Sequence, residues 1–192
     1  DPLEYMMANT ATASLTVSEP TITEKTLLQR CLEGERKAQK ELYQTYCNAM
    51  YTLAYRITSD ADLANDVLQD AFIDVFRDLK SFKSIGTIGS WIKTIVIRKA
   101  TKQVRFENRF ERFEEKHDVG ISYQTFSSRL LEREISALPE GYRTVFTLSE
   151  IEGYKHAEIA SMLNISVSTS RTQLFHAKRT LRERLKNERD NY

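Results

Sequence analysis

The chain has 192 residues, 41% hydrophobic and 29% charged, and this composition excludes a wholly disordered or fibrous protein. Its 28 basic and 27 acidic side chains leave a net charge of +1, so any nucleic-acid site must come from local charge. Six glycines and three prolines are too few turn-formers for an all-β protein. We therefore expect an all-α protein.

Targeting and redox signals point to the cytoplasm. No segment reaches the ~20 apolar residues that a membrane-spanning helix needs, and the N-terminus lacks a basic region followed by an apolar core. Cys31 and Cys47 do not form a CxxC pair, so a disulfide framework is not expected. We expect a cytoplasmic protein without membrane insertion.

The first predicted domain covers residues 25–105 and follows a disordered tail over residues 1–24. Apolar residues recur at three- and four-residue steps to Ile57, with a break at Gly34. A second helix over 60–79, capped near Asp60, carries aspartates on its polar side. A loop over 80–89 follows, and Ser90 is expected to cap a helix from Trp91 to Arg105.

The order of charges in this domain predicts two different partners. Carboxylates repel phosphate, so the polar side of the helix over 60–79 suits a basic protein partner. The predicted protein-binding residues are Asp66, Gln69, Asp70, Ile73 and Arg77. The helix after the loop carries cations without acids, and aromatic side chains beside cations suit an unpaired DNA strand. The predicted residues for this second site are Phe82, Ser84, Trp91, Lys93, Arg98, Lys99, Lys102 and Arg105.

Residues 106–127 lose the helical periodicity and are the predicted linker to a second domain over 128–192. Within it, His156–Lys178 has the pattern of a helix-turn-helix, with Asn164 at the turn and Ser166 as the cap of the second helix. Polar residues at the start of such a helix reach base edges in the major groove, and later cations such as Lys178 reach phosphates. The predicted DNA-binding residues are Ser168, Arg171, Thr172, His176 and Arg179.

Together, DLANDVLQDAFIDVF, the loop, SWIKTIVIRKATKQVR and the C-terminal helix-turn-helix resemble the extracytoplasmic-function group of bacterial sigma-70 factors. The resemblance implies a sigma factor that directs promoter recognition, melting and transcription initiation. It implies docking of the acidic helix on the clamp coiled coil of core RNA polymerase. It assigns the minus-ten promoter element to the loop and basic helix, and the minus-thirty-five element to the helix-turn-helix. It also implies an anti-sigma partner.

Departures from the family pattern fall on DNA-reading segments. Asn164 and Ser166 replace a usual Gly and Pro, Gln173 a usual Arg, and Ser170 a usually apolar residue. These differences affect the expected promoter sequence more than the expected family.

Two other functions would each account for part of the sequence. A helix-turn-helix regulator with an N-terminal dimerisation or ligand domain would explain the C-terminal half but not the acidic helix, loop and basic helix in succession. An enzyme is disfavoured, because His117, His156 and His176 lack metal-ligand spacing and no phosphate-binding loop or nucleophile motif is present. We expect no catalytic residues, metal or cofactor.

Overall fold

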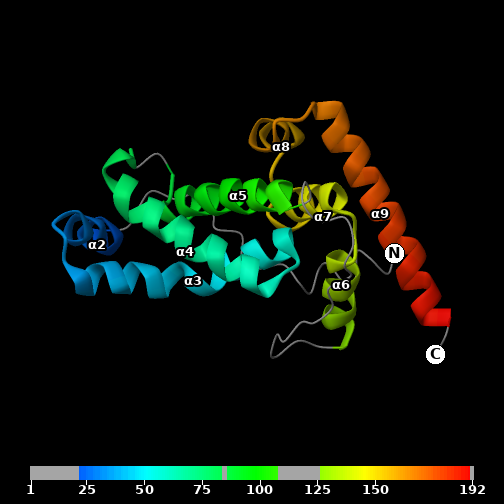
Figure 1. Cartoon of the computed structure of the whole chain (residues 1–192), viewed down its shortest axis with the longest axis horizontal. Helices are drawn as coiled ribbons and strands as arrows, with labels where there is room; N and C mark the ends of the chain where they lie inside the picture. The colour runs from blue at the N-terminus through cyan, green and yellow to red at the C-terminus, as the bar shows by residue number, and fades with distance from the viewer. Residues whose placement is uncertain (1–21, 84–85, 108–125, 191–192) are drawn as a thin grey trace. The chain divides into compact units, whose positions relative to one another are not determined.

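The computed structural model describes residues 22–83, 86–107 and 126–190, and these residues form helices joined by turns, with no strand among them (Figure 1). Their contacts separate two compact units, with residues 22–107 in one and 126–190 in the other. The all-α prediction is confirmed. Within the described ranges no helix is both long and apolar enough to cross a membrane.

Helices α3, α4 and α5 pack against one another in the first unit and bury one core between them. The helices are α2 (Ile22–Leu32), α3 (Arg36–Thr58), α4 (Ala61–Asp78) and α5 (Ile88–Glu107), with a short 3-10 turn at Leu79–Ser81. Leu42, Ile57 and Ile92 are fully buried in this core. Burying side chains of this size is the main stabilising term of such a bundle.

Local chemistry sets the junction between α3 and α4. Ser59 takes a left-handed conformation with φ of 58°, and its N–H donates to the carbonyl of Tyr55 at 2.7 Å. The Asp60 carboxylate then accepts from the backbone N–H groups of Asp62 and Leu63 at 2.9 and 3.0 Å. The predicted cap at Asp60 is confirmed. It gives a hydrogen-bond acceptor to two N–H groups at the start of α4 that have no partner within the helix.

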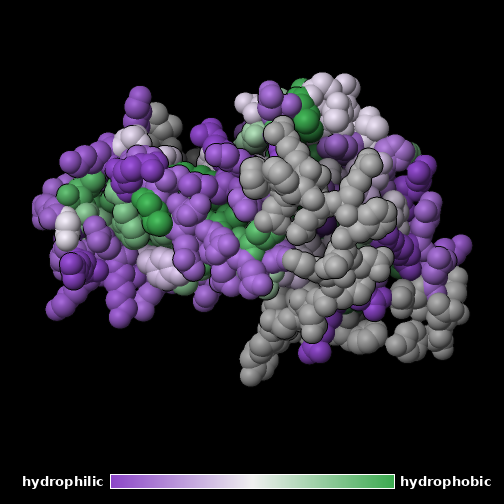
Figure 2. Space-filling view, in the orientation of Figure 1, coloured by the Kyte–Doolittle hydropathy of each residue, from purple (hydrophilic) through white to green (hydrophobic). Residues whose placement is uncertain are grey.

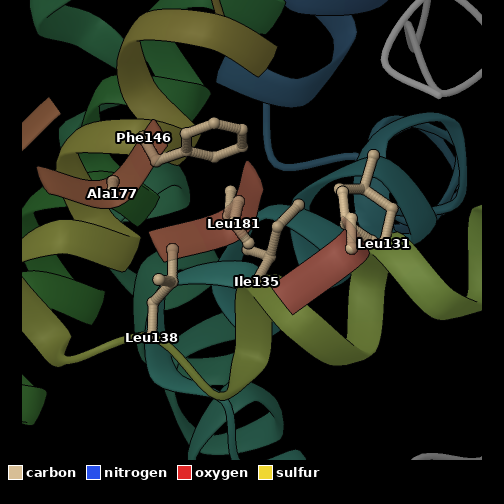
Figure 3. Packing of buried hydrophobic residues seen from close by; sticks show 7 residues of the cluster. Leu131, Ile135, Leu138, Phe146, Ala177 and Leu181 are labelled. Carbon is tan, nitrogen blue, oxygen red and sulfur yellow. The ribbon is translucent and has the colours of Figure 1, made fainter. Parts of the chain in front are cut away.

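The second unit holds α6 (Phe126–Ser136), α7 (Glu140–Phe146), a π-helical turn (Thr147–Ile151), α8 (His156–Leu163) and α9 (Val167–Asp190). Figure 3 shows how its core brings α6, α7 and α9 together through Leu131, Ile135, Leu138, Phe146, Ala177 and Leu181. Arg143 fixes the turn between α6 and α7, because its Nη1 donates to the carbonyls of Ser136 and Leu138 at 3.2 and 2.9 Å.

Two expectations from the sequence need correction. Helix α5 begins at Ile88, so Ser90 lies inside it, and the Thr87 hydroxyl caps it by accepting from the Ser90 N–H at 3.1 Å. Helix α2 begins at Ile22, inside the predicted tail of residues 1–24. In the second unit, the α-helical geometry of α7 gives way to π geometry at Thr147. Most of the predicted linker, residues 108–125, lies outside the described residues.

The π-helical turn buries the hydroxyl of Thr147. Thr147 is fully buried, and its Oγ1 has no hydrogen-bond partner among the described residues. We expect Thr147→Val to raise the free energy of unfolding by about 1 kcal/mol, because an unsatisfied buried hydroxyl carries a desolvation cost that a methyl group does not. Urea unfolding followed by circular dichroism measures the change.

Thr101→Val is the matched control for this prediction. Thr101 is also buried, but its Oγ1 donates to the carbonyl of Ile97 at 2.8 Å. The same change there removes a made hydrogen bond, so we expect a loss of about 1 kcal/mol. Similar losses in both variants would show that the Thr147 hydroxyl has a partner and would contradict the prediction.

Candidate protein and nucleic-acid interfaces

One side of α4 presents charge and an apolar side chain together. This α4 face consists of Asp66, Gln69, Asp70, Ile73 and Arg77, all of them exposed. The spacing of three and four residues puts these side chains on one side of the helix. Ile73 is 63% exposed, the most exposed large hydrophobic residue of this unit among those described. Figure 2 shows a hydrophobic area around α2 and α4 on an otherwise mainly hydrophilic surface of this unit.

An ion-pair cluster joins this face to α5. Lys99 Nζ lies 2.8 Å from a carboxylate oxygen of Asp74 and 3.9 Å from one of Asp70. Arg77 lies 2.8 Å from the other Asp74 oxygen. The hydrogen bond from Lys99, supported by the charges of Lys99 and Arg77, lowers the pKa of Asp74 below its ordinary value. Lys99, predicted to meet DNA, therefore points to α4 and is only 29% exposed.

Other cations of α5 remain on the surface. Arg98, Lys102 and Arg105 are exposed and follow one another at four- and three-residue steps, so they form one basic strip. Lys93 is partly exposed on the same helix. A strip of this kind can follow a phosphate backbone.

An aromatic pair stands at the start of this basic helix. The rings of Phe82 and Trp91 lie 5.6 Å apart at 46°, and both residues are partly exposed. The neighbouring Ile88 and Ile92 are fully buried and anchor this end of α5. The pair is thus held on the core while keeping some ring surface for a base. Ser84, the remaining predicted residue of this site, lies outside the described residues.

Helices α8 and α9 form the predicted helix-turn-helix. Asn164 ends α8 in a left-handed conformation with φ of 50°, which Asn tolerates better than most residues. The Ser166 hydroxyl accepts from the N–H of Thr169 at 2.9 Å and caps α9, as predicted. Beyond the cap, Ser168, Arg171 and Thr172 are exposed near the start of α9, where a recognition helix contacts base edges.

Family models match both halves of the chain. Residues 42–110 match sigma-70 region 2, and residues 128–181 match sigma-70, region 4. The ECF RNA polymerase sigma-E factor of Haemophilus influenzae is 27% identical over 182 residues, covering 85% of this chain and 96% of that protein. The chain belongs to the extracytoplasmic-function (ECF) group of the sigma-70 family. The RNA polymerase sigma-H factor of Pseudomonas aeruginosa is 29% identical over 174 residues, with 81% and 90% covered.

Two solved structures have a similar fold. The sigma factor RpoE of Bartonella quintana, solved with the anti-sigma factor NepR, superposes with a TM-score of 0.60 at 20% identity, over 77% of this chain and 96% of that one. CnrH, solved with the cytosolic domain of CnrY, gives a TM-score of 0.54 at 22% identity, over 85% and 97%. At these identities the likeness concerns the fold.

Helix α9 contains an ion pair and an exposed aromatic side chain that the sequence did not predict. Lys178, predicted for phosphate, forms an ion pair with Glu150 at 2.8 Å, whereas Arg179 remains exposed. Phe175 is 62% exposed, one turn from both Arg171 and Arg179, although it belonged to no predicted site. Its position one helical turn after Arg171, a predicted base-reading residue, is the sequence signal that could have identified Phe175.

His156 and Ser170 connect the two helices of the motif. Ser170 is fully buried in α9, and its hydroxyl lies 2.9 Å from Nδ1 of His156 at the start of α8. A polar residue at this usually apolar position is thus satisfied by a partner 14 residues away. His156 has a structural partner, and no group of three or more metal-ligating side chains gathers in the described parts of the chain.

Proposed function

We propose that this ECF sigma factor binds core RNA polymerase through the α4 face and directs it to promoter DNA through α5 and α9. The observation that carries the proposal is that one chain has both an exposed acidic and apolar helix face and two helices with exposed basic side chains. Negative charge disfavours DNA and favours a basic protein surface, such as the clamp coiled coil that the family resemblance implies. Because polymerase and promoter are cytoplasmic, we place the chain in the cytoplasm.

The α5 site suits the unpaired strand of the minus-ten element. Arg98, Lys102 and Arg105 offer positive charge along the helix, and Phe82 and Trp91 offer ring surface at its start. Stacking on aromatic rings offsets part of the few kcal/mol that unpairing and unstacking a base costs. Nucleotidyl transfer belongs to the polymerase, and the sigma factor supplies recognition and strand capture.

The α9 site suits the duplex of the minus-thirty-five element. Ser168, Arg171 and Thr172 lie near the start of the helix, and Arg179 is positioned for a phosphate one turn beyond Phe175. Phe175 adds an apolar group to this face, and an apolar side chain in the major groove contacts the methyl group of thymine. We therefore expect thymine at the base pair that Phe175 meets.

An anti-sigma protein is the third proposed partner. The sigma factor RpoE was solved with the anti-sigma factor NepR, and CnrH was solved with the cytosolic domain of CnrY. A protein that covers the α4 face here would compete with core polymerase for Asp70 and Ile73.

Arg171→Ala is expected to weaken binding to the preferred upstream element by roughly 1–3 kcal/mol, because a bidentate contact to a guanine edge is lost. Competition binding of the sigma–core complex to matched and scrambled duplexes measures the change. Arg179→Ala is the matched control, because a phosphate contact is lost equally on both duplexes. An equal loss on both duplexes for Arg171→Ala would instead make Arg171 a phosphate contact.

Reconstituted transcription tests the whole proposal. The chain and core polymerase are mixed, passed over a sizing column and supplied with a library of genomic promoter fragments. We expect co-elution and run-off transcripts that core polymerase alone does not make. A chain that binds duplex DNA but never co-elutes with core polymerase would be a helix-turn-helix regulator, the alternative function.

A further inference from the structure

His176 contacts two aromatic rings. The ring of Tyr142, from α7, stacks on the imidazole with centroids 5.6 Å apart and planes within 17°. The ring of Phe175, the preceding residue, meets the imidazole edge-on, at 5.5 Å and 73°. Tyr142 lies outside the recognition helix and belongs to none of the predicted sites, yet it touches a predicted base-reading residue.

Tyr142 is held in place by its own surroundings. It packs against the core of α6, α7 and α9. The next residue, Arg143, is buried and tied by two hydrogen bonds to the turn after α6. The preceding residue, Gly141, lies directly under Gln173 of α9, whose Nε2 would be 2.7 Å from a Cβ at that position. The first turn of α7 is therefore a rigid support for the side chains of α9.

His176 needs such a support if it reads a base. The rotation of an imidazole about its last side-chain torsion is broad, so the rotamer alone does not set the plane of the ring. Its two nitrogens lie on the ring edge, and only a fixed plane directs one of them at a base. Stacking on Tyr142 restricts this rotation in the free protein, so the His176 side chain loses less conformational entropy when DNA binds.

We propose that Tyr142 is a positioning residue for promoter readout, which orients the imidazole of His176 toward a base edge of the minus-thirty-five element. The proposal rests on the proposed function of α9. It predicts that promoter specificity depends on a residue of α7 that itself contacts no base.

Base preference in the sigma–core complex tests this role. The full-length chain, bound to core polymerase, selects duplexes randomised over the upstream element, and the preference at each position is compared among variants. We expect His176→Ala to lose preference at one position or two adjacent positions, and Tyr142→Leu to reduce preference at the same positions by roughly 5-fold. Tyr142→Phe keeps the ring and is expected to match the wild-type chain. Tyr142→Leu combined with His176→Ala should equal His176→Ala alone.

A spectroscopic readout accompanies the selection. The chain has three histidines, and in the free protein Tyr142 should shift the ring protons of His176 upfield by its ring current. Tyr142→Leu is expected to remove this shift and Tyr142→Phe to keep it. Thermal unfolding checks that each variant is folded, and Tyr142→Met replaces Tyr142→Leu if the latter does not fold.

The outcomes separate the two levels of the proposal. A uniform loss of affinity with Tyr142→Leu, or unchanged preference at the positions that His176→Ala affects, would overturn the positioning role. Unchanged base preference in His176→Ala would overturn it too, because His176 would then read no base. A wild-type complex without any preference in the upstream element would instead contradict the proposed function of α9.

Discussion

Replacing Ile73 with Asp is expected to weaken binding to core RNA polymerase by at least 2 kcal/mol, about 30-fold, without lowering the stability of the sigma factor. Ile73 sits among the charged residues of the α4 face and is 63% exposed, so the free protein gains little from its side chain. An apolar residue at the centre of an interface, ringed by polar side chains, is the usual position of a binding hot spot. A carboxylate in place of this apolar side chain would lose the apolar contact and carry a desolvation cost on burial.

Titration of labelled sigma factor with core polymerase measures this effect, and Leu32→Asp is the matched control. Leu32 is an exposed apolar residue of the same unit, 40% exposed at the end of α2, and lies outside the α4 face. We expect it to bind core polymerase like the wild-type chain. If the Ile73 variant and the wild type bound core polymerase with equal affinity, α4 would not be the docking helix, even if the sigma factor and core polymerase still co-elute.

Sequence patterns were sufficient for most of the fold because the signals that start and stop these helices are local. The Asp60 carboxylate and the Ser166 hydroxyl bond to N–H groups two or three residues ahead, and Asn164 uses its own backbone freedom. Each of these helix boundaries is determined by residues within one turn of each other, so it can be predicted from the sequence. The misplaced cap of α5 is of the same kind, since Thr87 and Ser90 are both capable caps three residues apart.

The misread residues share a different physical origin. Lys99 and Lys178 each pair with an acid from another segment, at Asp74 and Glu150. Sequence shows that a cation lies on a polar side of a helix, but not which neighbouring helix its long side chain reaches. Tertiary packing determines which acid a lysine pairs with. A basic surface predicted from helical periodicity alone is therefore larger than the one that remains available to DNA.

The Lys99 pairing also changes how the DNA site is understood. With Lys99 held by Asp74, the exposed basic strip of α5 consists of Arg98, Lys102 and Arg105. The carboxylates that hold Lys99 belong to the helix proposed to dock on polymerase. The sides of α4 and α5 for which we propose different partners are therefore connected through the partly exposed ion pair of Lys99 and Asp74. Asp74 contributes to this connection and is not one of the residues of the α4 face.

Replacing Leu181 with Ala is expected to lower the stability of the region 4 unit by 2–5 kcal/mol and to leave the region 2 unit unchanged. Leu181 is fully buried in α9 among residues of α6 and α7 (Figure 3), so its truncation removes apolar contacts and leaves a cavity at their junction. A unit of this size has a total stability on the order of 5–15 kcal/mol, so the loss is a large share of it. The recognition helix would lose its support while the α4 face remained folded.

The single tryptophan of the chain makes this expectation testable in one experiment. Trp91 lies in the first unit, so its fluorescence reports unfolding of that unit alone, whereas circular dichroism reports helix loss in both. In urea, Leu181→Ala should shift the dichroism transition to lower concentration and leave the fluorescence transition in place. Leu42→Ala, at a fully buried position of the first unit, should shift the fluorescence transition by a comparable amount. Coincident shifts of both signals in Leu181→Ala would mean that the units unfold as one, and would contradict the proposal that regions 2 and 4 are independent domains on a linker.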